Sequence, residues 1–115
     1  METWIIIIVA VLFIVWRMKP IKGIKTISTD TLKGMLNDKD KVFIDVRTPG
    51  EHKAKNIHQF KNLPLGSDLS KLPKDKEIVV ICQSGVRSSQ ACKQLKKLGY
   101  ESVTNVRGGM SAWKG

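Results

Sequence analysis

Residues 77–88 read Glu77-Ile-Val-Val-Ile-Cys-Gln-Ser-Gly-Val-Arg-Ser88. The first half is a nearly continuous apolar run of strand length. A strand that is apolar on both faces is typical of a parallel sheet covered by helices on either side. The second half is a short turn that leads into a helical pattern. This stretch therefore predicts a strand, a tight loop and a helix, the unit from which α/β domains are built.

The turn at residues 82–88, called the Cys82 loop below, has the composition of an anion-binding site. A strand-to-helix turn of this length can bring several backbone N–H groups together, and Gly85 permits the backbone angles that this needs. Those N–H groups and the positive end of the next helix favour an anion, so Cys82 is expected to form a stabilised thiolate with a lowered pKa. Arg87 adds a positive charge and a planar donor pair for an oxyanion. The alternative is that Cys82 merely ends a buried strand, and the Gly and Arg that follow favour a reactive thiol.

The rest of the soluble part follows the same alternation of strands and helices. Further strands are predicted at residues 41–46 and 102–106, with weaker candidates at 25–28 and 62–65. Helices are predicted after a cap at Ser28 or Thr29, after the Thr48-Pro-Gly-Glu51 capping box, and over residues 88–98, where Gly99 ends the helix. The pattern indicates an α/β domain whose site lies beyond the carboxyl ends of the strands.

Three motifs resemble those of the rhodanese family. The Cys82 loop resembles its active-site loop, Asp45-Val-Arg47 followed by Glu51 resembles its upstream signature, and Arg107-Gly-Gly-Met110 followed by Ala112-Trp113 resembles its C-terminal motif. The similarity runs from about residue 25 to residue 114. It implies a rhodanese-like, doubly wound five-stranded parallel sheet and a cysteine that carries sulfur as a persulfide.

The resemblance also implies roles for individual residues. Cys82 and Arg87 would be catalytic. The substrate-binding loop would consist of Gln83, Ser84, Gly85, Val86 and Ser88. We expect Asp45 to support this loop, and Arg47 and Glu51 to pair with each other at the corner between strand and helix.

One segment departs from the family pattern. Relatives usually carry a Gly-His-Ile-Pro-Gly-Ala-like stretch where this chain has residues 55–60, Lys-Asn-Ile-His-Gln-Phe. Only Ile57 matches. We expect this segment to border the active site, so its replacement leaves the identity of the substrate open but not the fold.

The predicted function is sulfur transfer by double displacement. Cys82 would take sulfane sulfur from a small anionic donor such as thiosulfate, or from a persulfide, and pass it to a thiol or to cyanide. No metal or organic cofactor is implied, since His52 and His58 lack metal-ligand spacing and are interpreted as surface or loop residues. Cys92 is either a resolving thiol or, as its place on an apolar helical stripe favours, a small core residue.

Two other functions stay open. The domain could be a persulfide carrier or interaction module with little turnover of small molecules, because a carrier needs the same cysteine and loop. It could also resemble phosphatases or arsenate reductases, but the related phosphatase loops place five residues between the cysteine and the arginine. Only four separate Cys82 from Arg87. The smaller ring suits a sulfur atom better than a phosphoryl group.

Charge and cysteine content limit the partners and the compartment. The formal net charge is +10, which favours anionic partners. Aromatic residues are sparse and no basic stripe is interleaved with them, so nucleic acid is not expected as a partner. The acceptor protein is not identifiable from the sequence. Two cysteines do not make a disulfide framework, and their positions indicate a reducing compartment.

The N-terminal segment predicts a membrane anchor. Residues 4–16 contain no polar or charged side chain apart from their two terminal tryptophans, which favour membrane interfaces. We therefore expect a single-pass transmembrane anchor at 1–18, a basic linker at 19–25 and the rhodanese-like domain at 26–115. Basic residues follow the apolar run, so the domain is expected to face the cytoplasm. A cleaved signal peptide and an interfacial helix are the alternatives.

Overall fold

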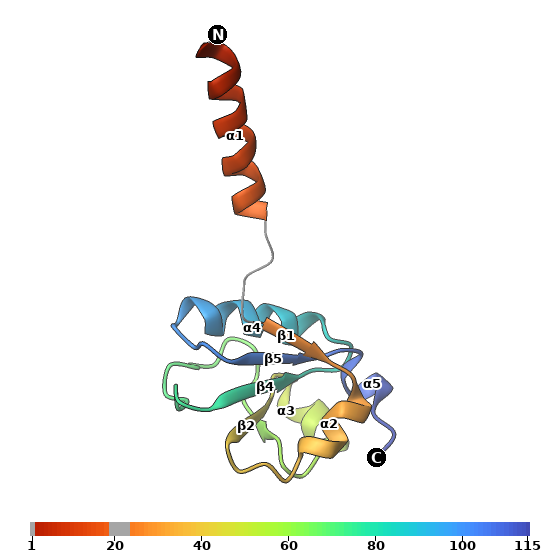
Figure 1. The fold of residues 1–115 in the computed structure, drawn as a ribbon. Coiled ribbons are helices and arrows are strands. Elements are labelled where there is room, and N and C mark those ends of the chain that lie inside the picture. The colour runs from red at the N-terminus through yellow and green to blue at the C-terminus, as the bar shows by residue number, and fades with distance from the viewer. Residues whose placement is uncertain (1, 19–23) are drawn as a thin grey trace.

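The computed structural model describes residues 2–18 and 24–115, and it places five strands in one sheet (Figure 1). The strands are β1 (Ile24–Ile27), β2 (Lys41–Asp45), β3 (Lys61–Asn62), β4 (Glu77–Ile81) and β5 (Val103–Val106). The helices are α1 (Glu2–Met18), α2 (Thr29–Met35), α3 (Pro49–Ala54), α4 (Val86–Lys97) and α5 (Gly109–Ala112).

The sheet is parallel throughout and has the strand order β1-β5-β4-β2-β3. The strands β2, β4 and β5 match the three main predictions, and the weaker candidates at 25–28 and 62–65 overlap β1 and, at Asn62 alone, β3. The strand β4 lies at the centre of the sheet, and its apolar run is buried on both faces. The predicted α/β class and five-stranded parallel sheet are therefore confirmed. Since β4 is central, the loop that follows it emerges in the middle of the carboxyl edge of the sheet.

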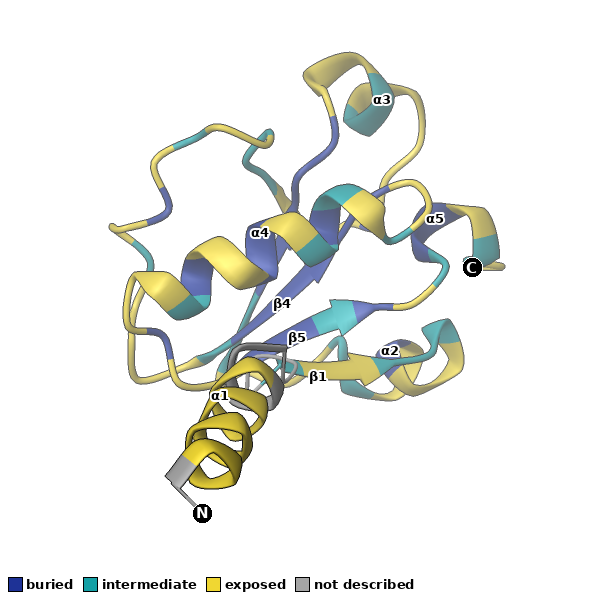
Figure 2. Cartoon of the chain, turned by 90° about the horizontal axis from the view of Figure 1, so that it is seen from above, coloured by how far each residue is buried: buried dark blue, intermediate teal, exposed yellow. Residues whose placement is uncertain are grey.

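Two apolar clusters cover the two faces of this sheet. Along β4, Ile78 and Val80 pack in one cluster with Ala91, Cys92 and Leu95 of α4. The alternate residues Val79 and Ile81 pack in the other cluster, which also contains Leu32 of α2, Val106 and Met110. Side chains of a strand alternate between its faces, so this division places α4 and α2 on opposite sides of the sheet. Figure 2 shows α4 lying over β4 and β5.

Local sequence signals account for the helix starts. Ser28 caps α2, since its Oγ accepts a hydrogen bond from the backbone N–H of Thr31 at 3.2 Å. Thr48 and Glu51 form the predicted reciprocal capping box at the start of α3. The helix α4 begins at Val86, two residues before the predicted start. The single turn α5 was not predicted, because four residues carry too little periodic pattern to be recognised.

The N-terminal prediction needs a correction. The apolar segment does form a helix, α1, and the large apolar side chains from Trp4 to Ile14 are exposed. However, α1 has 17 residues, which corresponds to about 25 Å at 1.5 Å per residue, against a hydrocarbon core of ~30 Å. Among the helices that the structure describes, none is both long and apolar enough to cross a membrane. The structure therefore does not support the predicted transmembrane helix.

The predicted basic linker at 19–25 is described only at its end. Residues 19–23 lie outside the described residues. Ile24 and Lys25 already belong to β1 and pair with Val103 and Thr104 of β5. The folded domain thus begins at Ile24, two residues before the predicted start at residue 26.

Candidate active site

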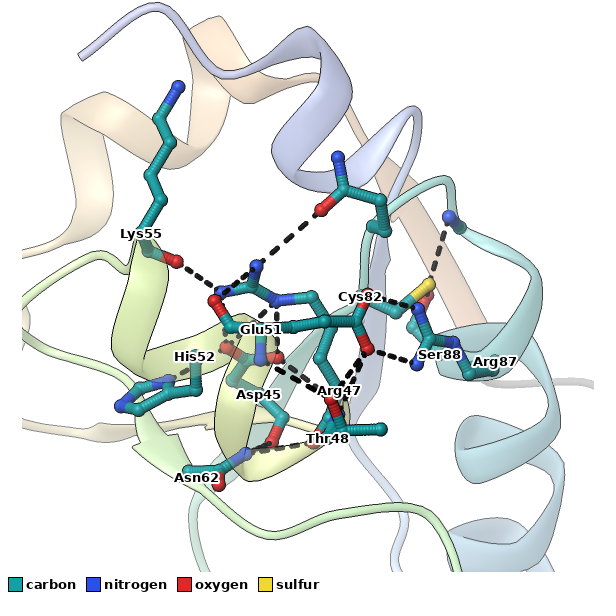
Figure 3. Close-up of polar contacts among 12 residues, drawn as sticks. Asp45, Arg47, Thr48, Glu51, His52, Lys55, Asn62, Cys82, Arg87 and Ser88 are labelled. Atoms are coloured by element: carbon teal, nitrogen blue, oxygen red, sulfur yellow. Dashed lines mark hydrogen bonds and ion pairs between the residues drawn. The ribbon is translucent and has the colours of Figure 1, made fainter.

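Cys82 follows β4 directly, and its side chain points into the loop that bears its name (Figure 3). The residue is 1% exposed. The backbone N–H of Gly85 donates to Cys82 Sγ at 2.9 Å, and Ser88 Oγ lies 3.3 Å from the same sulfur. The predicted turn therefore does direct hydrogen-bond donors toward one point, and Cys82 Sγ lies at that point.

The hydrogen bonds decide the acidity of Cys82. Burial by itself raises the pKa of a thiol. In the Cys82 loop this is outweighed by hydrogen bonds from the Ser88 side chain and from the backbone N–H groups of Ser88, Gly85 and Ser84, so the pKa of Cys82 lies below its ordinary value. A lowered pKa increases the share of thiolate, which is the nucleophilic form.

Ser88 is shared between Cys82 and a residue that sequence reasoning missed. Its hydroxyl donates to Asn105 Oδ1 at 2.5 Å, and Asn105 Nδ2 donates to the Gly85 carbonyl at 3.4 Å. Ser88 has one hydroxyl hydrogen, so its side chain stabilises the thiolate only when that hydrogen turns from Asn105 toward Sγ. The polar residue near the end of an otherwise apolar strand, β5, was the available signal for Asn105.

The segment that follows Gly108, residues 109–111, contacts the backbone of the Cys82 loop. The backbone N–H of Met110 donates to the Cys82 carbonyl at 2.8 Å, and that of Ser111 donates to the Gln83 carbonyl at 2.9 Å. Gly109 has φ +53, and a Cβ at this position would collide with the Cys82 carbonyl oxygen and lie 2.9 Å from the carbonyl carbon of Gln83. Only glycine permits this close approach of two backbones. The motif at 107–110 was recognised from the sequence, but its contact with the loop was not.

Asp45 reaches the Cys82 loop through Arg47 rather than directly. Both side chains are buried, and Arg47 Nη2 lies 2.7 Å from Asp45 Oδ2. Burial alone raises the pKa of Asp45, but the hydrogen bonds from Arg47 and His52 outweigh it and lower that pKa. Arg47 also donates to the carbonyl of Lys55 at 2.6 Å and to Gln83 Oε1 at 3.5 Å. This geometry is what a supporting role for Asp45 requires, and it connects the atypical segment 55–60 to the loop.

The ion pairs at this corner differ from those predicted. Glu51 does not pair with Arg47 through its carboxylate, although its backbone carbonyl accepts from Arg47 Nη1 at 3.2 Å. The Glu51 carboxylate instead forms a bidentate ion pair with Arg87, with Nη1–Oε1 at 2.7 Å and Nη2–Oε2 at 2.9 Å. Hydrogen bonding to Arg87 is the largest cause that lowers the pKa of Glu51 to about 2. The expected cation of the loop is therefore already neutralised, because the strand-to-helix turn brings residue 87 against α3.

His52 was interpreted as a surface or loop residue, but it lies in the helix α3 and is only partly exposed. Its ring is 22% exposed, and Nδ1 lies 2.8 Å from Asp45 Oδ2. His52 follows Glu51 in α3, and one turn of helix places it over the buried carboxylate. His58 is exposed, as predicted. Within residues 2–18 and 24–115, no group of three or more potential ligands is placed to hold a metal ion.

Cys92 lies in the middle of α4 and is 0% exposed. Burial, together with a smaller contribution from the charge of Cys82, raises the pKa of Cys92 to about 12. Both cysteines are free thiols. The interpretation of Cys92 as a packed core residue is therefore the one that the structure favours over a resolving thiol.

Comparison with known proteins agrees with this geometry. A family model, described as the rhodanese-like domain, matches residues 28–115. The chain is 38% identical over 94 residues to a protein of Allochromatium vinosum named sulfurtransferase, covering 78% of this chain and 88% of that protein. It is 43% identical over 96 residues to the putative sulfurtransferase YtwF of Bacillus subtilis, covering 80% and 92%. The crystal structure of a rhodanese-like domain protein from Staphylococcus aureus matches with a TM-score of 0.69 and 35% identity, covering 77% of this chain and 90% of that one.

Proposed function

Because the chain belongs to the rhodanese-like domain family, we propose that it is a sulfurtransferase that carries sulfane sulfur as a persulfide on Cys82. The observation that carries the proposal is the pair of contacts at the sulfur, from the Gly85 N–H at 2.9 Å and from Ser88 Oγ at 3.3 Å. These donors favour a thiolate before the reaction, and the same N–H groups suit the negative outer sulfur of a persulfide afterwards.

The proposed reaction has two displacement steps. In the first, the Cys82 thiolate attacks the outer sulfur of the donor, the donor S–S bond breaks, and the rest of the donor leaves with the bonding electron pair. For thiosulfate, the leaving group is sulfite. In the second, a thiolate or cyanide attacks the outer sulfur of the persulfide, and Cys82 leaves as the thiolate that started the cycle.

The Arg87–Glu51 pair bears on the choice of donor. A free arginine would offer its charge to a dianion such as thiosulfate, but both guanidinium Nη atoms of Arg87 face Glu51. In the proposed mechanism Arg87 therefore holds α3 against the start of α4, and the backbone N–H groups meet the charge of the donor. This arrangement favours a persulfide donor, which carries less charge, over thiosulfate.

Mass spectrometry of the intact protein tests the proposal. The protein is incubated with thiosulfate or with a low-molecular-weight persulfide, desalted, and measured before and after treatment with a reductant. We expect a mass gain of one sulfur atom that is located on Cys82 and disappears on reduction. Cys82→Ser is the control and should gain nothing. A wild-type protein that never acquires this sulfur would refute the proposal.

Turnover of small substrates distinguishes a persulfide carrier and a phosphatase from the proposed sulfurtransferase. A carrier would load sulfur on Cys82 and release it slowly to cyanide or to small thiols. A phosphatase would release phosphate from an aryl phosphate through Cys82 and would ignore thiosulfate.

Orientation toward the cytoplasm, inferred from the charges after the apolar segment, stays a prediction. Exclusion of a membrane-impermeant thiol reagent from the domain in intact cells would support it.

A further inference from the structure

The outer side of α4 is basic and open. The helix contains four basic residues and no acidic one, the basic set being Arg87, Lys93, Lys96 and Lys97. Its buried residues face the sheet, so the remaining residues form an outer surface, seen as the yellow bands of α4 in Figure 2. A long helix that presents only one sign of charge is a recognition feature when it borders an active site.

Two open grooves lie along the two sides of this helix. The first has a volume of about 510 Å³ and is bounded by α4, by the Cys82 loop and by the carboxyl ends of β1 and β5. The second, of about 430 Å³, lies between α4 and the turn at Leu65 and Gly66. Gln90 and Lys93 line both grooves, so they form a ridge between them. The residues that line either groove are called the α4 surface below.

The α4 surface carries positive charge that nothing described in the chain neutralises. Lys93 and Arg107 line the first groove, and Lys93 and Lys97 line the second. None of these three side chains forms a hydrogen bond or ion pair with a residue of the described ranges. No aspartate or glutamate lines either groove. In contrast, Arg87 is held by Glu51. The free charge near the active site therefore lies on the α4 surface and not in the loop.

The first groove lies beside residues that bond Cys82 or its bonding partners, although Cys82 itself does not line it. Gly85 lines it, and the N–H of the same residue donates to Cys82 Sγ. Asn105 lines it too, and this side chain bonds both Ser88 and the Gly85 carbonyl. Apolar side chains complete the surface, since Val86 is 64% exposed at the first groove and Leu65 is 40% exposed at the second. Exposed apolar residues within a basic rim are typical of a protein-binding surface.

From these observations we propose that the α4 surface binds an acidic segment of a partner protein that exchanges sulfur with Cys82. A small molecule would fill one groove only, whereas a polypeptide can cross the ridge at Lys93 and occupy both. Its acidic side chains would meet Lys93, Lys97 and Arg107, and an apolar side chain between them would cover Val86. The inference rests on the proposed sulfur transfer for its purpose, but the binding itself can be measured without any turnover.

The test measures binding of fluorescent peptides to the full chain. Three peptides of about fifteen residues share one apolar residue and contain no cysteine; six positions are all glutamate, all glutamine or all lysine. The protein variants are Lys93→Glu/Lys97→Glu and, as a matched control, Lys33→Glu/Lys39→Glu. The control changes the net charge equally, on exposed residues in and just after α2, across the sheet from α4. Alkylation of Cys82 by neutral iodoacetamide checks that both variants keep an intact site.

We expect the glutamate peptide to bind at least tenfold more tightly than the glutamine peptide, and the lysine peptide not to bind. Lys93→Glu/Lys97→Glu should lose about tenfold or more of this affinity, whereas Lys33→Glu/Lys39→Glu should lose less than threefold. Equal losses in the two variants would overturn the proposal, because binding would then follow net charge alone. It would also be overturned if a single-stranded oligonucleotide of equal charge bound more tightly than the glutamate peptide at the same site. If the peptide binds as expected but Cys82 never loads sulfur, the docking surface stands and the sulfurtransferase proposal fails.

Discussion

Cys82 and Cys92 are almost equally buried, with 1% and 0% of their surfaces exposed, yet their pKa values are shifted from that of an ordinary thiol in opposite directions. They belong to the same apolar cluster between α4 and the sheet. Cys92 lies within a continuous helix, whose backbone N–H groups are already bonded to helical carbonyls. Cys82 lies at the start of a turn, where the N–H of Gly85 is free to point at its sulfur.

The comparison shows that burial alone does not decide whether the pKa of a thiol rises or falls. Taking a thiolate out of water is unfavourable, so burial by itself acts to raise the pKa of both thiols. Only at Cys82 do several donors replace the lost water. The break between β4 and α4 provides them, because the first N–H groups of a helix have no partner within the helix.

The largest expected effect separates the two thiols directly. Cys82→Ser should reduce sulfur transfer from thiosulfate to cyanide by at least about 10³-fold, since a hydroxyl is scarcely ionised near neutral pH and cannot hold sulfane sulfur. Cys92→Ser should keep activity within about threefold but lower the free energy of unfolding by about 1–3 kcal/mol, because a hydroxyl is buried in an apolar cluster. Initial rates and denaturant unfolding measure both. If the two cysteines formed a redox pair, either change would abolish activity.

Gly109→Ala should remove much of what distinguishes the Cys82 loop. The added Cβ would meet the backbone of Cys82 and Gln83, at a φ of +53 that side chains rarely adopt. We expect a loss of about 1–3 kcal/mol in unfolding free energy and a drop in activity larger than this destabilisation explains. Gly34→Ala is the control, because no atom lies within 4 Å of its added Cβ. A fully active Gly109→Ala protein would show that α5 does not hold the loop.

Ser88→Ala should make the two thiols more alike. Without this hydroxyl the Cys82 thiolate loses one donor, so its pKa should rise toward that of an ordinary thiol. Because the thiolate is the reactive form, alkylation by iodoacetamide should then begin at higher pH and be roughly tenfold slower near neutral pH. At high pH, where both proteins are fully ionised, the rates should converge. Ser89→Ala is the neighbouring control. A profile unchanged from wild type would assign the lowered pKa to the backbone N–H groups alone.

The smallest expected effect concerns the ion pair beside the loop. Arg87→Gln and Glu51→Gln each break the same contact and leave the donors at Cys82 Sγ in place. We expect a severalfold loss of activity in each variant, and the double variant should be little worse than either single one, since neither partner acts alone. If Arg87 instead binds the donor directly, Arg87→Gln will raise KM strongly while Glu51→Gln will not. Steady-state rates across thiosulfate concentrations distinguish the two cases.

Local patterns were sufficient for most of the fold. The apolar run at β4, the capping box at Thr48 and the glycine of the Cys82 loop each act within a few residues, and each was identified correctly. Contacts between distant residues were not predictable in this way. Glu51 was assigned to Arg47, four residues away, but pairs with Arg87, 36 residues away. Asn105 and Gly109 border the loop only because β5 lies beside β4 in the sheet.

The sequence by itself determined the α/β class and the order of the strands and of the helices up to α4, and it singled out Cys82 as the candidate reactive cysteine, because periodicity, capping and turn chemistry are short-range properties of the chain. The tertiary structure alone decided how the polar groups are shared around that cysteine. It assigned Glu51 to Arg87, His52 to Asp45 and Ser88 to Asn105, and it left Lys93, Lys97 and Arg107 facing open grooves. A charged side chain pairs with the group that the folded sheet places close to it, and separation along the sequence does not predict which group that is.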